Sequence, residues 1–264
     1  MITKMLKLKN STTAYFDEGK GKGIVLLHGF CGSKDYWGKV IPALSEQYRV
    51  IAPDLPGHGN SSSIESNDTI DKIADHIKEI VDELKVQDVT LFGHSLGGYV
   101  ALAFAEKYSD RLEAFSLIHS TAFPDSDDAK KGRDASVEKI KDEDIGSFID
   151  GLVPKLFSPE NLEKNEEDVN TAKDIGYSTS PQGAIETLIA MKNRPDRNNV
   201  LTSTQLPVLL IAGEQDQIIP PEKTFSVSSD NIKQFLIKDS GHMSMYENPK
   251  DLITQMKEFM SSYN

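Results

Sequence analysis

The sequence predicts an α/β protein in which helices cover both faces of a mostly parallel sheet. Three short apolar runs, at residues 24–27, 89–92 and 208–212, are each followed within two residues by a glycine, a pattern typical of buried parallel strands. Segments with apolar residues at helical spacing separate these runs, as in βαβ units. At 264 residues, the chain is long enough to form one domain with a substantial core.

The remaining strands and helices follow the same patterns. Apolar or alternating runs predict further strands at residues 1–9, 50–52, 115–118 and 234–237. Apolar residues at helical spacing predict helices over residues 69–84, 96–107 and 251–260. Asp68 or Asn67 is expected to cap the first of these helices, because both side chains accept hydrogen bonds from free backbone N–H groups.

The alternation of strands and helices stops between residues 121 and 199. This polar stretch contains two helix-like segments, at 145–156 and 181–191, and the strand pattern resumes at Leu206. One interpretation is a solvated surface excursion. Because long insertions in compact domains are usually functional or disordered, we expect instead a helical cap over an active site. The predicted core then comprises residues 1–120 and 200–264.

Composition and charge exclude several classes of partner. The 41 acidic residues outnumber the 29 basic ones, which gives a net charge of −12 and disfavours binding to nucleic acid or to an anionic membrane. No apolar stretch approaches the roughly 20 residues that span a bilayer. Cys31 is the single cysteine, so no intramolecular disulfide is possible. With no signal-like apolar segment at residues 1–9, these features predict a cytoplasmic protein.

A candidate nucleophile lies in the segment Gly93-His94-Ser95-Leu96-Gly97, between a predicted strand and a predicted helix. A serine on such a sharp turn exposes its hydroxyl above the sheet. Glycine suits positions 93 and 97, because a strained turn leaves no room for neighbouring Cβ atoms. Free N–H groups in the first helical turn point to where an oxyanion would form. We therefore predict that Ser95 is a nucleophile; its alternative role is a helix cap.

Five segments together resemble the α/β-hydrolase family, along nearly the whole chain and in the family's order. They are residues 27–33 (LHGFCGS), 54–61 (DLPGHGNS), 93–98 (GHSLGG), 213–216 (GEQD) and 241–242 (GH). The resemblance implies a mostly parallel eight-stranded α/β-hydrolase sheet with helices on both faces and an inserted helical cap. Serine at position 95 disfavours the dehalogenase and epoxide-hydrolase branches, which use aspartate there.

A serine nucleophile needs a general base and a group that orients this base. Of the six histidines, His242 is the best placed, in a loop between a predicted strand and the C-terminal helix. It is also the only one in the family's chain order of serine, acid and histidine. Asp216 follows the run at 208–212, in the family's usual position for the acid, and Asp125 is the alternative.

Other residues near these motifs have weaker predicted roles. The resemblance assigns the oxyanion hole to the backbone N–H groups of Phe30 and Leu96. His119, which ends a predicted strand, and Trp37 are candidate substrate contacts.

The remaining histidines have structural explanations. His28 and His58 lie in glycine-rich turns, where histidines more often bond the backbone, and His94 adjoins Ser95 but points in a different direction. His76 is expected to be exposed on its helix.

These residues predict a carboxylesterase that cleaves a small-molecule ester without a metal or cofactor. One alternative is a lyase or carbon–carbon bond hydrolase of a carboxylate metabolite, because His-Gly-Phe-x-Gly-Ser followed by Trp37 also resembles menaquinone-pathway synthase-like members. Such an enzyme would need basic side chains in its pocket, and the obvious cluster is Lys192, Arg194 and Arg197. Another alternative is a ligand receptor that retains the triad and turns over slowly. The sequence does not indicate the oligomeric state.

Overall fold

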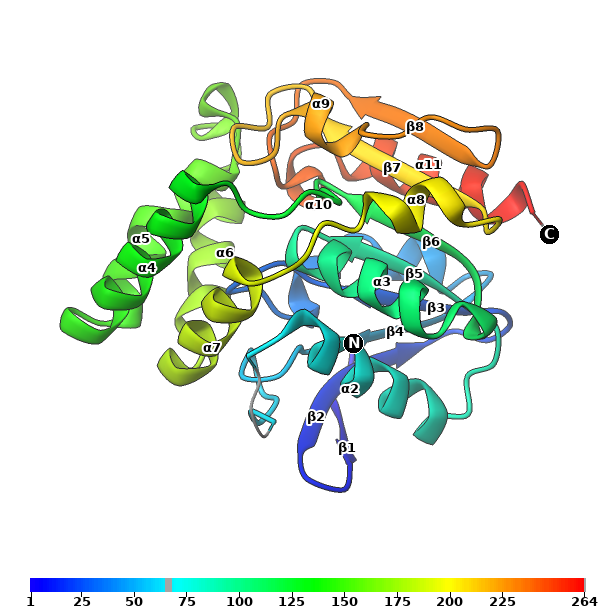
Figure 1. Cartoon of the computed structure of the whole chain (residues 1–264), viewed down its shortest axis with the longest axis horizontal. Coiled ribbons are helices and arrows are strands. Elements are labelled where there is room, and N and C mark those ends of the chain that lie inside the picture. Colours follow the sequence, from blue (N-terminus) through cyan, green and yellow to red (C-terminus); the bar gives the residue numbers. More distant parts are fainter. Residues whose placement is uncertain (65–67, 264) are drawn as a thin grey trace.

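The computed structural model describes residues 1–64 and 68–263, which form one eight-stranded sheet with helices on both faces (Figure 1). The strands are β1 (Lys4–Lys7), β2 (Thr12–Glu18), β3 (Gly23–Leu27), β4 (Arg49–Pro53), β5 (Val89–His94), β6 (Leu112–Ile118), β7 (Val208–Gly213) and β8 (Ile232–Ile237). Their order is β1-β2-β4-β3-β5-β6-β7-β8. Strand β2 is antiparallel to its two neighbours, and the other pairs are parallel. The predicted fold class is confirmed.

The central strands are buried on both faces, which explains their continuous apolar sequences. Every residue of β3, β5 and β7 is buried. Helices cover both sides of these strands, so apolar side chains are favoured at every position instead of every second one. The sequence pattern missed β2, whose Thr-Thr-Ala-Tyr-Phe-Asp-Glu sequence has no such run.

Helices pack on the two faces of the sheet in separate groups. Those outside the long insertion are α1 (Ile41–Leu44), α2 (Ile70–Glu83), α3 (Leu96–Lys107), α8 (Asn198–Ser203), α9 (Pro221–Thr224), α10 (Ser244–Glu247) and α11 (Pro249–Ser261). Helices α2, α3 and α8 lie on one face, and α1 and α11 lie on the other (Figure 1). Among the described residues, no helix has the length and apolar character needed to cross a bilayer.

Helix α2 shows how the sequence sets a helix and its limits. Its buried isoleucines, with Ile73 and Ile77 at the centre, form one stripe against the core. Thr69 is the N-cap, because its hydroxyl accepts from the backbone N–H of Lys72. The predicted cap Asp68 is wrong, since its carboxylate pairs with the Lys72 ammonium group instead.

Two other predictions for this region have different outcomes. Asn67, the alternative cap, lies outside the described residues. The predicted exposure of His76 is wrong: this side chain is 5% exposed and its Nε2 lies 2.9 Å from the Thr13 hydroxyl. The charged neighbours of His76 in the sequence point to solvent, whereas the helical stripe turns His76 inward.

The segment between β6 and β7 forms a helical insertion beside one end of the sheet (Figure 1). Its helices are α4 (Asp127–Asp142), α5 (Ile145–Leu156), α6 (Glu166–Tyr177) and α7 (Pro181–Lys192). Helix α4 packs on α7, and α5 packs on α6. The insertion also contacts the core directly, because Ser180 N–H donates to the Gly57 carbonyl in the turn after β4. Helix α5 has the predicted bounds, whereas the polar sequences of α4 and α6 gave no clear signal.

Candidate active site

The turn after β5 holds Ser95 in a strained conformation. Its φ of 51° and ψ of −112° lie in a region that residues other than glycine rarely adopt. A Cβ at Gly93 would lie 2.2 Å from the Gly97 carbonyl oxygen, and one at Gly97 would lie 2.3 Å from the Leu27 carbonyl oxygen. Both glycines are therefore needed for β5, β3 and the start of α3 to pack this closely beneath the serine.

Asp216 and His242 meet in the loops that follow the neighbouring strands β7 and β8. His242 Nδ1 donates to Asp216 Oδ2 at 2.8 Å. The other carboxylate oxygen accepts from the backbone N–H groups of Ile218 and Ile219, at 2.8 and 2.9 Å. Burial raises the pKa of Asp216, but the adjacent His242 and His119 outweigh burial and hold this pKa well below its usual value. An ionised Asp216 thus fixes the His242 tautomer and leaves Nε2 free to accept a proton.

Sequence reasoning missed Glu247, which fixes the backbone on both sides of His242. Gly241 N–H and Met243 N–H donate to Glu247 Oε1 at 2.9 and 3.1 Å. The N–H of His242 itself donates to the Leu156 carbonyl at 2.8 Å, at the end of α5. Glu247 is 7% exposed. The signal that could have identified Glu247 is an acidic residue that follows a largely apolar stretch a few residues after His242.

Glu247 also connects the histidine loop to the insertion. Its Oε2 accepts from Ser158 N–H and from the Asn161 side-chain amide, both at 2.9 Å. The loop that presents His242 is therefore held from the sheet side and from the insertion side at once.

His119 and Trp37, the predicted substrate contacts, do not line the cavity that holds Ser95. His119 is fully buried, with Nδ1 3.4 Å from Asp216 Oδ2 and Nε2 2.7 Å from the Ser244 hydroxyl. Trp37 is fully buried, with its ring edge-on to that of His94. His119 was predicted to contact substrate because it follows a strand end. In the structure this position places its ring against Asp216 and Ser244 instead.

Three further histidines bond to the backbone. His28 Nδ1 donates to the Gly29 carbonyl, and its Nε2 accepts from Leu55 N–H, both at 2.8 Å. His58 Nδ1 donates to the carbonyl of Pro56. His94 Nε2 donates to the main-chain carbonyl of His242 at 2.9 Å. Burial lowers the pKa of all three imidazoles, to about 4 for His58. Burial therefore favours the neutral form of all three rings, and His94 in addition lines the Ser95 cavity.

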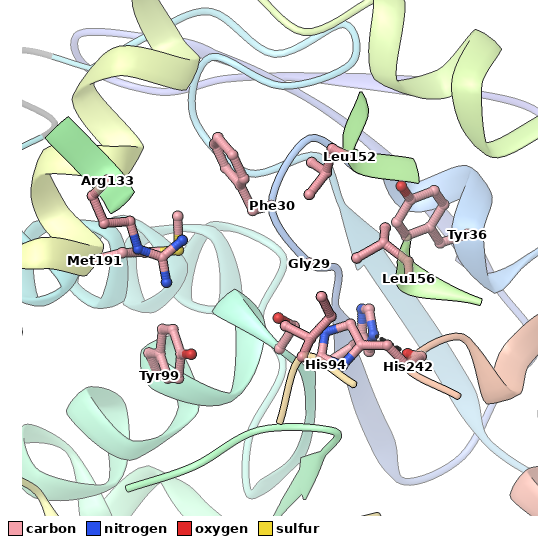
Figure 2. A pocket seen from close by; sticks show the side chains of 12 residues that line it. Gly29, Phe30, Tyr36, His94, Tyr99, Arg133, Leu152, Leu156, Met191 and His242 are labelled. Atoms are coloured by element: carbon pink, nitrogen blue, oxygen red, sulfur yellow. Dashed lines mark hydrogen bonds between the residues drawn. The ribbon is translucent and has the colours of Figure 1, made fainter. Parts of the chain in front are cut away.

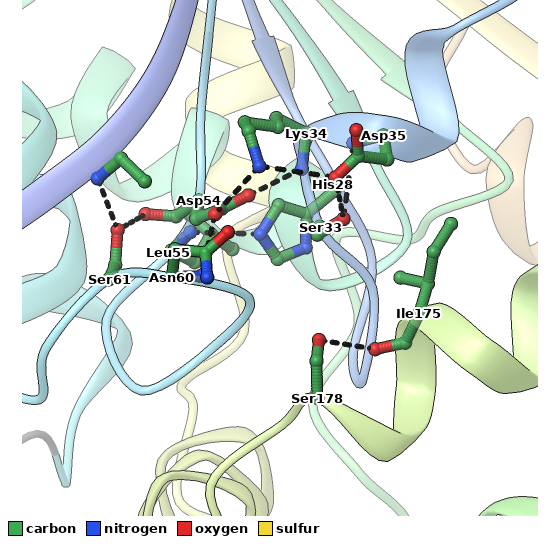
Figure 3. Close-up of polar contacts among 11 residues, drawn as sticks. His28, Ser33, Lys34, Asp35, Asp54, Leu55, Asn60, Ser61, Ile175 and Ser178 are labelled. Carbon is green, nitrogen blue, oxygen red and sulfur yellow. Dashed lines mark hydrogen bonds and ion pairs between the residues drawn. The ribbon is translucent and has the colours of Figure 1, made fainter. Parts of the chain in front are cut away.

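Figure 3 shows a buried polar network that supports the loop before α1. Asp54 accepts from Lys34 N–H at 2.7 Å and from Asn60 N–H at 2.9 Å. The Lys34 ammonium group lies 3.3 Å from the same carboxylate, and both side chains are buried. Burial raises the pKa of Asp54, against the opposite effect of the Asn60 and Lys34 contacts. The motif at residues 54–61 therefore fixes two loops to each other.

Two backbone N–H groups are free beside Ser95. Throughout residues 1–64 and 68–263, neither the Phe30 N–H nor the Leu96 N–H has a hydrogen-bond partner. Phe30 lines the cavity, and Leu96 is the first residue of α3, where N–H groups have no intrahelical acceptor. Cys31, next to Phe30, is buried, and burial raises the pKa of its thiol.

The serine turn and the insertion together enclose a cavity of about 70 Å³ (Figure 2). Ser95 and His242 line it from the core. Leu152 of α5 and Met191 of α7 close it from the insertion. Arg133 of α4 also reaches this cavity, although no sequence pattern distinguished it from the other charged residues of that helix.

The alternative acid, Asp125, is held by arginines. Its carboxylate accepts from Arg133 Nε at 3.1 Å and from Arg194 Nη1 at 2.6 Å.

The predicted basic cluster is dispersed. Arg197 pairs with Asp71 and Glu106, and Lys192 pairs with Asp134. Arg194 alone of this cluster lines a cavity next to that of Ser95.

Among the described residues, one group of side chains has the spacing of possible metal ligands. It consists of His119, Asp216 and His242, whose ligand atoms lie within 4.8 Å of one another. The 2.8 Å contact between His242 Nδ1 and Asp216 Oδ2 is a direct hydrogen bond. Ligands about 2.1 Å from a tetrahedral zinc ion lie farther apart than this. The geometry fits a carboxylate that orients a histidine through a hydrogen bond better than it fits a metal site.

A mostly parallel eight-stranded sheet, with a serine turn after β5 and an aspartate–histidine pair after β7 and β8, is the framework of the α/β hydrolases. The chain belongs to this family: residues 23–249 match the alpha/beta hydrolase fold.

The chain is similar to several known members. It is 27% identical to Lipase 3 of Moraxella sp. over 252 residues, which covers 92% of this chain and 78% of the lipase. It is 26% identical to 3-oxoadipate enol-lactonase 1 of Acinetobacter baylyi, with 86% of this chain and 84% of that enzyme covered. Among solved structures, a thermophilic esterase from Thermogutta terrifontis with malate bound superposes with a TM-score of 0.93 at 29% identity, with coverage of 98% and 99%.

Proposed function

We propose that the protein is a serine hydrolase that cleaves an ester bond of a small molecule, with Ser95 as nucleophile, His242 as general base and Asp216 as the orienting acid. One observation carries this proposal. Ser95 lies on a strained turn and lines the same cavity as His242. The Nδ1 atom of His242 is hydrogen-bonded to Asp216 Oδ2 at 2.8 Å. The lipase and esterase relatives support ester hydrolysis, and we propose a carboxylesterase.

The proposed reaction proceeds by acyl transfer. His242 Nε2 takes the Ser95 proton while Oγ bonds to the ester carbonyl carbon. The carbon–oxygen bond to the alcohol then breaks, and the alcohol leaves with the proton from His242. Water, deprotonated by the same imidazole, releases the acid and restores Ser95. Asp216 stays ionised and stabilises the imidazolium.

The free N–H groups of Phe30 and Leu96 are the proposed oxyanion hole. They would donate to the carbonyl oxygen as its negative charge develops. Loss of one such donor typically costs about 3 kcal/mol of transition-state stabilisation.

A second candidate is a lyase or carbon–carbon bond hydrolase of a carboxylate metabolite. The observation that favours it is the pair of arginines, Arg133 and Arg194, beside the cavity. The malate bound to the Thermogutta esterase is itself a dicarboxylate.

The test combines a fluorophosphonate label with p-nitrophenyl esters of short and long acids. The wild-type protein and a Ser203→Ala control, which alters an exposed serine of α8, should be labelled and should turn over an ester. Ser95→Ala should fold normally, escape labelling and lose turnover. Labelling of Ser95 without turnover of any ester would favour the lyase or a slow ligand receptor. Full activity of Ser95→Ala would overturn the proposal.

A further inference from the structure

A second cavity, of about 460 Å³, adjoins the cavity of Ser95; we call it the side chamber. The two cavities share Tyr99, Arg133 and Ile218 in their walls. Arg194 and Asp125 also line the side chamber. A small molecule that reacts at Ser95 would therefore have its other end next to these charged groups.

The lining of the side chamber carries more positive than negative charge, with Arg133, Arg194 and Lys223 against Asp125 and Asp196. Asp125 accepts from Arg133 Nε at 3.1 Å and from Arg194 Nη1 at 2.6 Å. Burial raises the pKa of Asp125, but the two guanidinium groups outweigh burial and keep this pKa below its usual value. One ionised carboxylate between two guanidinium groups leaves one unit of positive charge.

Several donors of these arginines remain unused. Among the described residues, Arg133 makes its hydrogen bond through Nε, so its two terminal nitrogens, on a partly exposed side chain, have no protein partner. The buried Nε of Arg194 also has none. Arg194 is 7% exposed and stacks on the Tyr99 ring, 4.0 Å from its centre. A buried donor without an acceptor is unfavourable, because it has lost its hydrogen bond to water and gained none in return. Such donors beside a reaction cavity indicate an acceptor that arrives with a ligand.

Arg133 is placed to act on that ligand. Its guanidinium extends from α4 into the cavity, on the same side as Met191 and Tyr99 (Figure 2). It also borders a third recess, whose described lining residues include Lys139 and Lys155 and no acidic side chain. In a chain with a net charge of −12, this local excess of basic side chains would attract anions.

We propose that the substrate carries a carboxylate, which Arg133 and Arg194 bind at the side chamber while its ester carbonyl lies at Ser95. This inference rests on the proposed ester hydrolysis, and it names the substrate class as esters with a free carboxylate, such as half-esters of short dicarboxylic acids. The free end of Arg133 offers two parallel N–H groups that match a carboxylate in bidentate geometry. One excess positive charge matches a monoanion better than a phosphate dianion.

The first experiment compares matched substrates with the wild-type protein. The monoethyl esters of succinate, glutarate and adipate carry a carboxylate, and their carboxamide analogues have nearly the same shape without charge. We expect kcat/KM to be at least tenfold higher for one or more half-esters than for the matching amide, with the difference shrinking as salt rises. Equal rates for all three pairs would overturn the inference and leave ester hydrolysis standing.

The second experiment removes the charge. Arg133→Met should lower the half-ester to amide ratio of kcat/KM at least tenfold, and Arg133→Lys should lower it less. The matched control is Lys131→Met, which removes an exposed charge from the same helix and should keep the wild-type ratio. Thermal unfolding of each variant would verify the fold. A wild-type ratio in Arg133→Met would contradict the role of this residue.

A binding measurement separates failure of this inference from failure of the proposed reaction. Calorimetric titration of Ser95→Ala with monoethyl glutarate and with its amide analogue requires no turnover. Tighter binding of the half-ester, lost on adding Arg133→Met, would support the carboxylate site even if neither ester were hydrolysed. Equal binding of the two compounds would overturn it.

Discussion

The two walls of the Ser95 cavity, one from the sheet and its loops and one from the insertion, differ in how firmly hydrogen bonds hold their charged and catalytic side chains. On the sheet wall, both oxygens of Asp216 are bonded, as are the backbone N–H groups around His242. On the insertion wall, Leu152 and Met191 are apolar, and Arg133 retains unused donors. Groups with locked geometry suit chemistry, whereas apolar surface and spare donors suit recognition of a substrate.

This difference predicts which kinetic constant, kcat or KM, a variant in each wall should change. Changes on the sheet wall should lower kcat, because they disturb groups that act in the transition state. Changes on the insertion wall should mainly raise KM, because they disturb contacts that are the same in substrate and transition state.

The largest effect is expected for Asp216→Asn on the sheet wall. The amide has nearly the shape of the carboxylate, but it would favour the wrong tautomer of His242 and would not stabilise the imidazolium. By analogy with other triads, kcat should fall by about 10⁴-fold with little change in KM. Steady-state kinetics with a p-nitrophenyl ester would measure this. A loss smaller than tenfold would show that Asp216 is not the orienting acid.

Glu247→Gln tests whether the histidine loop must be held rigidly. Its amide nitrogen would face donors that now bond to a carboxylate oxygen, so the loop should shift. We expect kcat to fall by about 10- to 100-fold, as misplaced catalytic groups typically cause. The control is Glu222→Gln on the exposed side of α9, which should behave as wild type. An unchanged kcat in Glu247→Gln would show that Glu247 does not position the loop of His242.

Acid should destabilise the core through its buried histidines. Burial lowers the pKa of His76 to about 4, despite the opposing effect of Glu79. Between pH 6.5 and 4, the unfolded chain therefore binds a proton that the folded chain does not, so stability falls as the pH falls. From pH 8 to 5 this residue should account for about 2 kcal/mol.

Urea unfolding of His76→Gln at both pH values checks this. The variant should lose less stability on acidification than wild type, and a Lys72→Gln control on the same helix should match wild type. The same pH dependence in His76→Gln and wild type would contradict burial of a neutral His76.

The smallest effect is expected for Leu152→Ala on the insertion wall. The change enlarges the cavity without touching Ser95 or the loop of His242. KM for a short neutral ester should rise about three- to tenfold, consistent with about 1 kcal/mol of lost apolar contact, while kcat stays within a factor of two. A fall in kcat alone would show that the two walls do not act separately.

Much of the core was predictable because its signals are local. The buried strands β3, β5 and β7 appear as apolar runs, and the turn around Ser95 has glycines where Cβ atoms would clash. The pairing of Asp216 with His242 followed from the resemblance to the family and from chain order, and the structure brings the two residues into contact.

Contacts between distant segments were not predictable. His119 directly follows β6, but only the structure shows that it contacts Asp216 and Ser244 and is not among the residues that line the cavity. Arg133 is one of many charged residues on α4, and its position depends on how the insertion folds against the core.

The most direct test of the central claim is to trap the acyl-enzyme. The protein is mixed with p-nitrophenyl acetate, quenched in acid within the first turnover, digested and analysed by mass spectrometry. We predict one acetyl group on the peptide that contains Ser95, and none on that peptide in Ser95→Ala. Acetylation of another residue at the rate of turnover, or turnover that persists in Ser95→Ala, would contradict the account.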